Sequence, residues 1–486
     1  MKRTLLFVLI LIIPSLAAAA KLSVILDWFV NPNHGPIIIA QENGYFADQG
    51  LEVEIIAPAD AADPPKLVAA GKFDLAISYQ PQLHLQVAEG MPLIRVGTLG
   101  ATPLSPAQVR RTLAGPLGQR VLGGRVSVAV AGLTGPAAYS SGGAATPAST
   151  TKLVTAVAAL HTLEPGTTFA TRVVADGRDV VLVGGGDPFL ERRPDADAEP
   201  DRADLATLAR RTARALREVG GRSIRLGYDD GLFSGPPWNP TWPETYRGDV
   251  IAPITALMVD DGRPAEGSGR SLDPSYAAAD SFAALLRQRG IRIVGVPRES
   301  AAPDGATPLA QVESAPVGQL VDRLLQVSDN ETAEVLLRHV GLATGGAGST
   351  KDGVAGVREV LEELGVGVPR RLRDGSGLSR DNLIAPETLV GLLQVAAASE
   401  QSDPLRGLFP GLPVAGFSGS LTFRFDDAPP AAVGRVRAKT GTLRGVRSLA
   451  GLVVARDGTP MVFALMADRI AEEDDETAEA VLDRAA

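Results

Sequence analysis

Residues 147–152, Pro-Ala-Ser-Thr-Thr-Lys, run directly into a mostly apolar segment at 153–160. Apolar side chains at 153, 157 and 160 share one helical face, which predicts a buried helix with Ser149 at or near its N-terminus. Ser149 and Lys152 are three positions apart, so their Cβ atoms should lie about 5–6 Å apart on one face. An amine whose pKa is lowered by burial can take a serine proton at neutral pH. The pattern therefore indicates a nucleophile and its base; a capping serine beside a solvated lysine is the alternative.

Length and composition describe a folded, multidomain chain. Its 486 residues suggest two to four domains, and 45% apolar with 21% charged residues suffice for packed cores. The formal charge of −9 argues against nucleic acid as the main partner. Cysteine is absent, which excludes disulfides, thiolate metal sites and cysteine nucleophiles.

The N-terminus has the pattern of a secretory signal peptide. Lys2 and Arg3 precede an apolar core at 5–13, and small residues at 17–20 precede Lys21. We expect residues 1–20 to be cleaved before Lys21 and the protein to be exported to the periplasm or another extracytoplasmic cell-wall space. An uncleaved anchor is the alternative, although the apolar core is short for a bilayer span.

Residues 21–99 alternate strand-like and helix-like pieces. The strand-like pieces lie at 22–28, 51–56 and 73–78, with helix-like pieces at 35–43 and 65–70 between them. Strands that alternate with helices at such short intervals predict βαβ units on a parallel sheet.

Several short motifs in this segment resemble a known family. They are Leu26-Asp27-Trp28-Phe29, Asn31-Pro32-Asn33-His34-Gly35, Gly44-Tyr45-Phe46 and Asp74-Leu75-Ala76-Ile77-Ser78. Together they resemble the opening of periplasmic substrate-binding proteins that deliver thiamine pyrimidine precursors to an ABC importer. The resemblance implies that Asp27, Trp28 and His34 lie near a ligand cleft, with Trp28 as a stacking face or, equally, as an interior packing residue. It ends near residue 99, before the second lobe that such a cleft needs, so any contact with an ABC importer would be vestigial.

The choice between lysine and arginine also changes near residue 100. Residues 1–100 hold four lysines and two arginines, whereas residues 101–486 hold three lysines and thirty-eight arginines. This change predicts a fusion of two stretches of different origin. Two of the three later lysines, Lys152 and Lys439, lie in motifs, where a titratable amine cannot be replaced by guanidinium.

Two further motifs follow in the second stretch. Ser328-Asp329-Asn330 opens an apolar-periodic run at 331–340, which by itself predicts a helix N-cap. Lys439-Thr440-Gly441-Thr442-Leu443 lies in a strand-like run before a second one at 448–454, and a surface lysine is the alternative for Lys439.

Ser-x-x-Lys, Ser-Asp-Asn and Lys-Thr-Gly in this order are the signature of the penicillin-recognising serine enzymes. The first two motifs are 179 residues apart, which leaves room for an inserted module. With Gly185-Gly186-Asp187-Pro188 and Asp374-Gly375-Ser376-Gly377-Leu378-Ser379, residues 105–486 resemble class C low-molecular-mass penicillin-binding proteins. These are D-alanyl-D-alanine carboxypeptidases and endopeptidases.

The resemblance implies a multidomain α/β fold. A serine β-lactamase/DD-peptidase-like α+β domain would comprise residues 105–165 and 313–486, with an inserted α/β module at 166–312. A truncated periplasmic-binding-protein-like βαβ segment at 21–99 would precede it.

The resemblance also implies a role for each motif residue. Ser149 would attack the D-Ala-D-Ala carbonyl of a peptidoglycan stem peptide, Lys152 would take its proton, and Ser328 would pass a proton to the leaving amine. Asn330 would bind the substrate amide, and Lys439 would keep Lys152 neutral by like-charge repulsion and orient the substrate carboxylate. Thr440 and Thr442 would receive that carboxylate, beside Gly441, and the N–H groups of Ser149 and Thr442 would form the oxyanion hole. β-Lactam antibiotics would be covalent inhibitors, and no metal or cofactor is expected.

Two other functions remain open. A β-lactamase shares the three motifs, but no Glu-x-x-Leu-Asn stretch for deacylation occurs between Asn330 and Lys439. Alternatively, residues 21–99 could be the functional part, as a pyrimidine-binding module.

Overall fold

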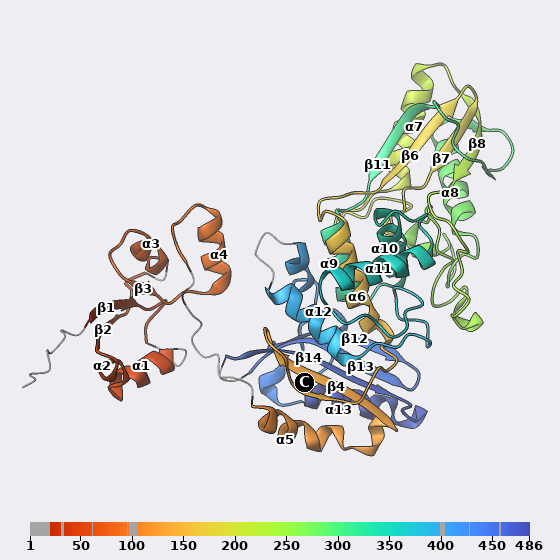
Figure 1. The fold of residues 1–486 in the computed structure, drawn as a ribbon. Helices are drawn as coiled ribbons and strands as arrows, with labels where there is room; N and C mark the ends of the chain where they lie inside the picture. Colours follow the sequence, from red (N-terminus) through yellow and green to blue (C-terminus); the bar gives the residue numbers. More distant parts are fainter. Residues whose placement is uncertain are drawn as a thin grey trace, which may run out of the picture. The chain divides into compact units, whose positions relative to one another are not determined.

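The computed structural model describes residues 20–30, 34–60, 62–94, 96, 105–398, 404–426, 428–455 and 458–486 (Figure 1). The chain divides into two compact units, residues 1–102 with 457–459, and residues 103–456 with 460–486. Residues 1–19 of the predicted signal peptide lie outside the described part, so its cleavage stays a prediction, as do the predicted domain boundaries. No helix in the described part is long and apolar enough to cross a membrane.

The first unit contains a three-stranded parallel sheet in the order β2-β1-β3. β1 (Ala20–Ile25) pairs in parallel with β2 (Leu51–Ile56) and with β3 (Leu75–Ala76). The helices of this unit are α1 (Gly35–Glu42), α2 (Tyr45–Asp48), α3 (Pro64–Ala69) and α4 (Gln80–Ala88). The parallel pairing with intervening helices confirms the predicted βαβ units.

The second unit is built on a five-stranded antiparallel sheet in the order β12-β13-β14-β4-β5. Its strands are β4 (Arg125–Gly132), β5 (Ala137–Ser141), β12 (Val436–Leu443), β13 (Val446–Val454) and β14 (Pro460–Asp468). The N-terminal α5 (Pro106–Leu117) and the C-terminal α13 (Asp475–Ala485) pack together on this sheet, and α12 (Pro386–Ala398) packs against β14 and β4 (Figure 1). The sheet therefore unites residues from both ends of this unit.

The helix α6 (Thr151–Thr162) is the centre of the helical part. All its residues from Thr151 to Leu160 are buried. It packs against α9 (Val317–Val327), α10 (Asn330–Ala343), α11 (Thr350–Glu363) and α12. The buried helix that the apolar run predicts is therefore present, but it begins at Thr151, because a 3₁₀ turn at Ala148–Thr150 precedes it.

A second sheet has the order β10-β8-β7-β6-β11, with β9 paired to β8. Its strands are β6 (Ala170–Asp176), β7 (Asp179–Val183), β8 (Ser223–Asp229), β9 (Arg292–Ile293), β10 (Arg298–Glu299) and β11 (Thr307–Glu313). The helices α7 (Leu205–Glu218) and α8 (Pro274–Gln288) pack on each other and on this sheet. Aspartates cap both helices, as Asp204 accepts from the Thr207 N–H and Asp273 from the Tyr276 N–H.

Candidate active site

Ser149 lies on a turn whose conformation is fixed by the residues around it. The preceding residue, Ala148, has φ 48°, a left-handed conformation that costs energy for a residue with a Cβ. The Pro147 carbonyl accepts hydrogen bonds from the hydroxyls of Thr150 at 2.7 Å and Ser448 at 2.5 Å. These bonds fix the turn and leave Ser149 half-buried at the start of α6.

Two glycines allow other backbone segments of the same chain to approach this turn. A Cβ on Gly441, in β12, would lie 2.6 Å from the Pro147 oxygen and 3.2 Å from the Ser149 nitrogen. A Cβ on Gly377 would lie 1.9 Å from the Ala148 oxygen, and its φ of +85° also favours glycine. A side chain at either position would push the neighbouring backbone away from the Ser149 turn, so both positions require glycine.

The Lys152 amine makes three hydrogen bonds. Nζ lies 2.9 Å from Ser149 Oγ, 2.8 Å from Asn330 Oδ1 and 2.8 Å from the Ser376 carbonyl oxygen. The side chain is fully buried, and this burial lowers the pKa of Lys152 to about 8, against the opposing charges of Asp329 and Asp374. An amine with that pKa is partly neutral near pH 7–8 and can accept the Ser149 proton.

The Ser328-Asp329-Asn330 triplet is both a helix start and part of the site. Asp329 is the N-cap of α10, since its Oδ1 accepts from the Thr332 N–H at 2.8 Å. Asn330 is the first residue of that helix, and its side chain reaches Lys152. Ser328 adopts a left-handed φ of 61° at the end of α9, and no hydrogen bond joins its hydroxyl to another described residue. In the described part of the chain, Lys152 thus has a hydrogen bond with Asn330 but none with the Ser328 hydroxyl.

The third motif lies in β12, which contacts the Ser149 turn. Lys439 is fully buried, so it is not a surface lysine, and its Nζ donates to the Thr440 carbonyl at 2.9 Å. Burial, then the charges of Lys152 and Arg424, lower the pKa of Lys439 well below its usual value. The charge of Lys152 thus lowers the pKa of Lys439, whereas the pKa of Lys152 itself is lowered by burial, so the predicted role of Lys439 in keeping Lys152 neutral stays a prediction.

The threonines of this motif differ in their surroundings. The Thr440 hydroxyl shares a hydrogen bond of 2.8 Å with the Ser420 hydroxyl, a neighbour that no sequence motif predicts. Thr442 is exposed, two residues further along the strand. Their predicted contacts with a substrate carboxylate stay predictions.

A fourth element of the site is the loop that supplies the Ser376 carbonyl. Glu334 Oε1 accepts from the N–H groups of Gly375 at 3.0 Å and Ser376 at 2.7 Å. Burial, then the charge of Asp374, raise the pKa of Glu334 to about 8. Residues 374–379 enter the prediction from sequence only through a family resemblance, and Glu334 does not enter it. Its one signal is its position one helical turn after Asn330, on the same face of α10.

The inserted module also contacts this loop. Asp374 Oδ2 accepts from the Trp242 indole N–H at 2.8 Å, and the Asn239 amide donates to the Arg373 carbonyl at 2.8 Å. The sequence of the module carries no catalytic signal, because these residues act through contacts with a loop more than a hundred positions away.

The candidate ligand residues of the N-terminal segment belong to the other compact unit. Asp27 and His34 are both buried and form a 2.5 Å hydrogen bond, which helps to lower the pKa of Asp27 against the opposing effect of burial. Trp28 is 51% exposed and contacts Phe29 edge-on. The interior-packing alternative for Trp28 is therefore wrong, because its ring lies outside the small core of this unit.

Comparisons with known proteins also divide the chain in two, with a boundary at residue 113 that lies just inside the second compact unit. The model of the D-Ala-D-Ala carboxypeptidase 3 (S13) family matches residues 113–267 and 263–486, and that of the NMT1/THI5-like family matches residues 31–113. A carboxypeptidase of Mycobacterium tuberculosis is 36% identical over 332 residues, covering 66% of this chain and 71% of that protein. The crystal structure of penicillin binding protein 4 from Haemophilus influenzae has the same fold, with a TM-score of 0.63 and 22% identity over 78% of this chain and 98% of that one.

The N-terminal relatives are covered only in part. A protein of Haemophilus influenzae named for thiamine biosynthesis is 59% identical over 101 residues, which are 21% of this chain but only 32% of that protein. The chain thus spans about a third of this relative, in keeping with a fusion that retains one part of it.

Proposed function

The chain belongs to the D-Ala-D-Ala carboxypeptidase 3 (S13) family and is a serine D-Ala-D-Ala carboxypeptidase/endopeptidase; we propose that it acts on peptidoglycan stem peptides through an acyl-enzyme on Ser149. One observation carries this assignment of the nucleophile. A buried amine, that of Lys152, lies 2.9 Å from the Ser149 hydroxyl.

In the proposed acylation step, neutral Lys152 takes the proton of Ser149 while Oγ attacks the carbonyl carbon of the D-Ala-D-Ala bond. The N–H groups of Ser149 and Thr442 receive the negative charge that develops on the carbonyl oxygen. The proton then leaves Lys152 for the leaving amine as the C–N bond breaks, and Ser328 would relay it through a hydrogen bond to Lys152 that forms only in the substrate complex. Water hydrolyses the resulting ester and frees Ser149.

Asn330 has two roles in this proposal, one toward the base and one toward the substrate. Its Oδ1 holds Lys152 Nζ at 2.8 Å, which leaves its amide NH₂ available to donate to a substrate carbonyl. Lys439, Thr440 and Thr442 would bind the terminal carboxylate of the substrate, whose negative charge offsets the cost of keeping a buried ammonium at Lys439.

The same site would be acylated by β-lactams, because a strained lactam carbonyl presents the same target to Ser149. The test is the mass of the intact protein after incubation with benzylpenicillin, beside a Ser149→Ala control. We expect a single adduct that persists and that the control lacks. A folded sample without an adduct would contradict the proposal, and rapid turnover of the penicillin would point to a β-lactamase instead.

We further propose that the protein acts outside the cytoplasm, where its substrate lies. The charged, apolar and small-residue order of residues 1–20 supports export. N-terminal sequencing of protein recovered from the extracytoplasmic fraction should begin at Lys21. Recovery of the full chain from the cytoplasm would contradict this assignment.

A further inference from the structure

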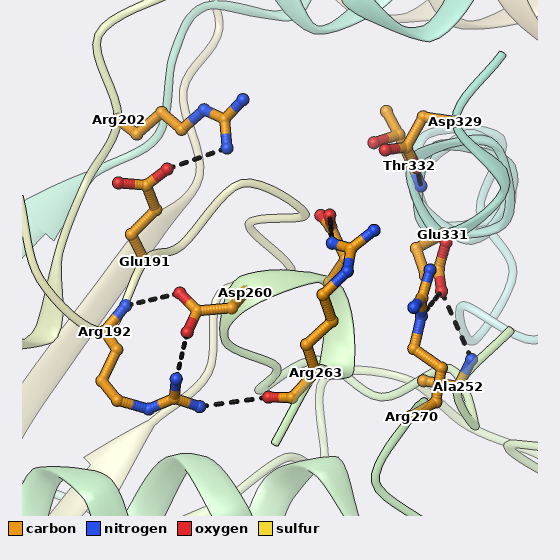
Figure 2. A network of polar contacts seen from close by, with 11 residues as sticks. Glu191, Arg192, Arg202, Ala252, Asp260, Arg263, Arg270, Asp329, Glu331 and Thr332 are labelled. Atoms are coloured by element: carbon orange, nitrogen blue, oxygen red, sulfur yellow. Dashed lines mark hydrogen bonds and ion pairs between the residues drawn. The ribbon is translucent and has the colours of Figure 1, made fainter. Parts of the chain in front are cut away.

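A polar cavity of about 440 Å³ lies beside the proposed proton donor Ser328. The inserted module lines it with Arg202, Arg263 and Arg270, while the end of α9 and the start of α10 line it with Arg323 and residues 327–331. In Figure 2 the guanidinium groups of Arg202 and Arg263 point from the module toward the start of α10, where Asp329 and Glu331 lie. Four arginines thus line a cavity that continues from the catalytic motif.

Three of these arginines have carboxylate partners. Arg202 donates to Glu191 at 2.8 Å and lies over the Phe189 ring. Arg263 pairs with Asp261, and Arg270 donates to Glu331 at 2.7 Å. In each pair the carboxylate largely neutralises the positive charge of the arginine, and the pairing fixes the side chains that form the walls of the cavity.

Arg323 differs from the other three. It forms no ion pair or hydrogen bond with another described residue, although it lines the cavity one helical turn before Val327. The remaining carboxylate of the lining, Asp329, caps α10 through the Thr332 N–H, and burial followed by the charge of Asp261 raises its pKa. Asp329 therefore opposes a bound anion less than an ordinary aspartate would, and Arg323 offers an unused pair of N–H donors suited to a carboxylate.

We propose that this cavity binds a carboxylate of the leaving strand when the substrate is a cross-linked peptide, with Arg323 as the residue that recognises it. The inference rests on the proposed function, in which Ser328 faces the leaving amine. A leaving D-alanine is one small residue whose carboxylate is assigned to Thr440 and Thr442, so it does not need the cavity. A leaving peptide strand continues beyond the cleaved bond and carries further carboxylates, and the volume fits a group of that size. Arg323 thereby favours endopeptidase over carboxypeptidase activity.

The test compares kcat/KM on a cross-linked peptide dimer with kcat/KM on a pentapeptide monomer, for wild type and Arg323→Gln. We expect the variant to lose about tenfold on the dimer and to change by less than about twofold on the monomer. Arg323→Lys, which keeps the charge but not the paired donors, should lose less. Arg287→Gln is the matched control, because Arg287 is exposed on α8 and outside the cavity.

A second arm identifies the carboxylate. The dimer is amidated at every leaving-strand carboxylate except the one next to the cleaved bond. For wild type, this should lower kcat/KM on the dimer as much as Arg323→Gln does. Arg323→Gln should then cause no further loss on the amidated dimer. Amidating only the acyl-donor strand should leave the effect of Arg323→Gln intact.

Three results would overturn the inference. Arg323→Gln could act like wild type on the dimer, it could impair the monomer equally, or its effect could depend on an acyl-donor carboxylate. Benzylpenicillin acylation is measured in parallel and should be unchanged in Arg323→Gln. Absence of the adduct in wild type would instead defeat the proposed function itself, so the two failures are distinguishable.

Discussion

Lys152 Nζ and Asn330 Oδ1 are 2.8 Å apart, although 178 positions separate the two residues in the chain. The bond joins the first turn of α6 to the first turn of α10. It holds the amine where it also meets Ser149 and the Ser376 carbonyl. The position of the proposed base is thus set by three segments that are far apart in the sequence.

Replacing Lys152 by methionine should abolish most acylation. Methionine fills similar space without an amine, so the fold should persist while Ser149 loses its base. We expect the rate of benzylpenicillin acylation to fall by about 10²–10⁴-fold. Samples quenched at successive times and analysed by mass spectrometry give the rate of adduct formation, and a cooperative unfolding transition shows that the variant is folded. Acylation at the wild-type rate would exclude Lys152 as the base.

Acylation should also depend on pH through Lys152. The neutral amine is the active form, and its pKa is lowered to about 8. The second-order rate constant for acylation should therefore rise as the pH increases from 6 to 9, with a midpoint near pH 8, since it reports the free enzyme. A rate that falls over this range would contradict the assignment.

Gly441→Ala should open the site. The new Cβ would lie 2.0 Å from Ser448 Oγ and 2.6 Å from the Pro147 oxygen, so β12 and the Ser149 turn must separate. We expect a loss of about 1–3 kcal/mol in the free energy of unfolding and an acylation rate about 10²-fold lower. Gly166→Ala is the control, because its Cβ would meet nothing within 4 Å. Equal behaviour of the two variants would refute the close approach.

Glu334→Gln and Glu334→Ala should differ. The pKa of Glu334 is raised to about 8, so the carboxyl is mostly protonated at pH 7 and glutamine reproduces its acceptor. Alanine would instead leave the buried Gly375 and Ser376 N–H groups without a partner, at a cost of about 1–3 kcal/mol for each. Denaturant unfolding and acylation rates at pH 7 should show a near-normal Gln variant and an impaired Ala variant. Equal impairment of both would mean that the ionised carboxylate is needed.

The N-terminal segment should not bind an aminopyrimidine tightly. Its match covers only 32% of the thiamine-related protein, and a cleft of that type needs a second lobe. Calorimetry of the full chain with an aminopyrimidine should give no saturable heat. Tight, saturable binding would establish residues 20–94 as a ligand module in their own right.

The sequence by itself determined the elements that depend on local pattern. The apolar run after Lys152 predicts α6, alternation of strands and helices predicts the parallel β2-β1-β3 sheet, and the three motifs in order predict the enzyme family. Local steric and hydrophobic preferences suffice for these, because each involves residues that are close in the chain. The 3₁₀ turn that moves the start of α6 to Thr151 escapes such patterns, since Ser448 of β13 donates a hydrogen bond to it and Gly441 of β12 packs closely against it.

Only the tertiary structure decided which groups complete the site. The Ser376 carbonyl meets Lys152 across 224 positions, Glu334 supports that loop, and the arginines of the inserted module meet Arg323 around one cavity. None of these groups can be recognised from the neighbouring sequence. Backbone carbonyls, helix glutamates and arginines occur throughout a chain, and only tertiary packing gives particular ones a role. Burial then lowers the pKa of Lys152 and raises that of Glu334, and both shifts depend on a core that the whole second unit builds.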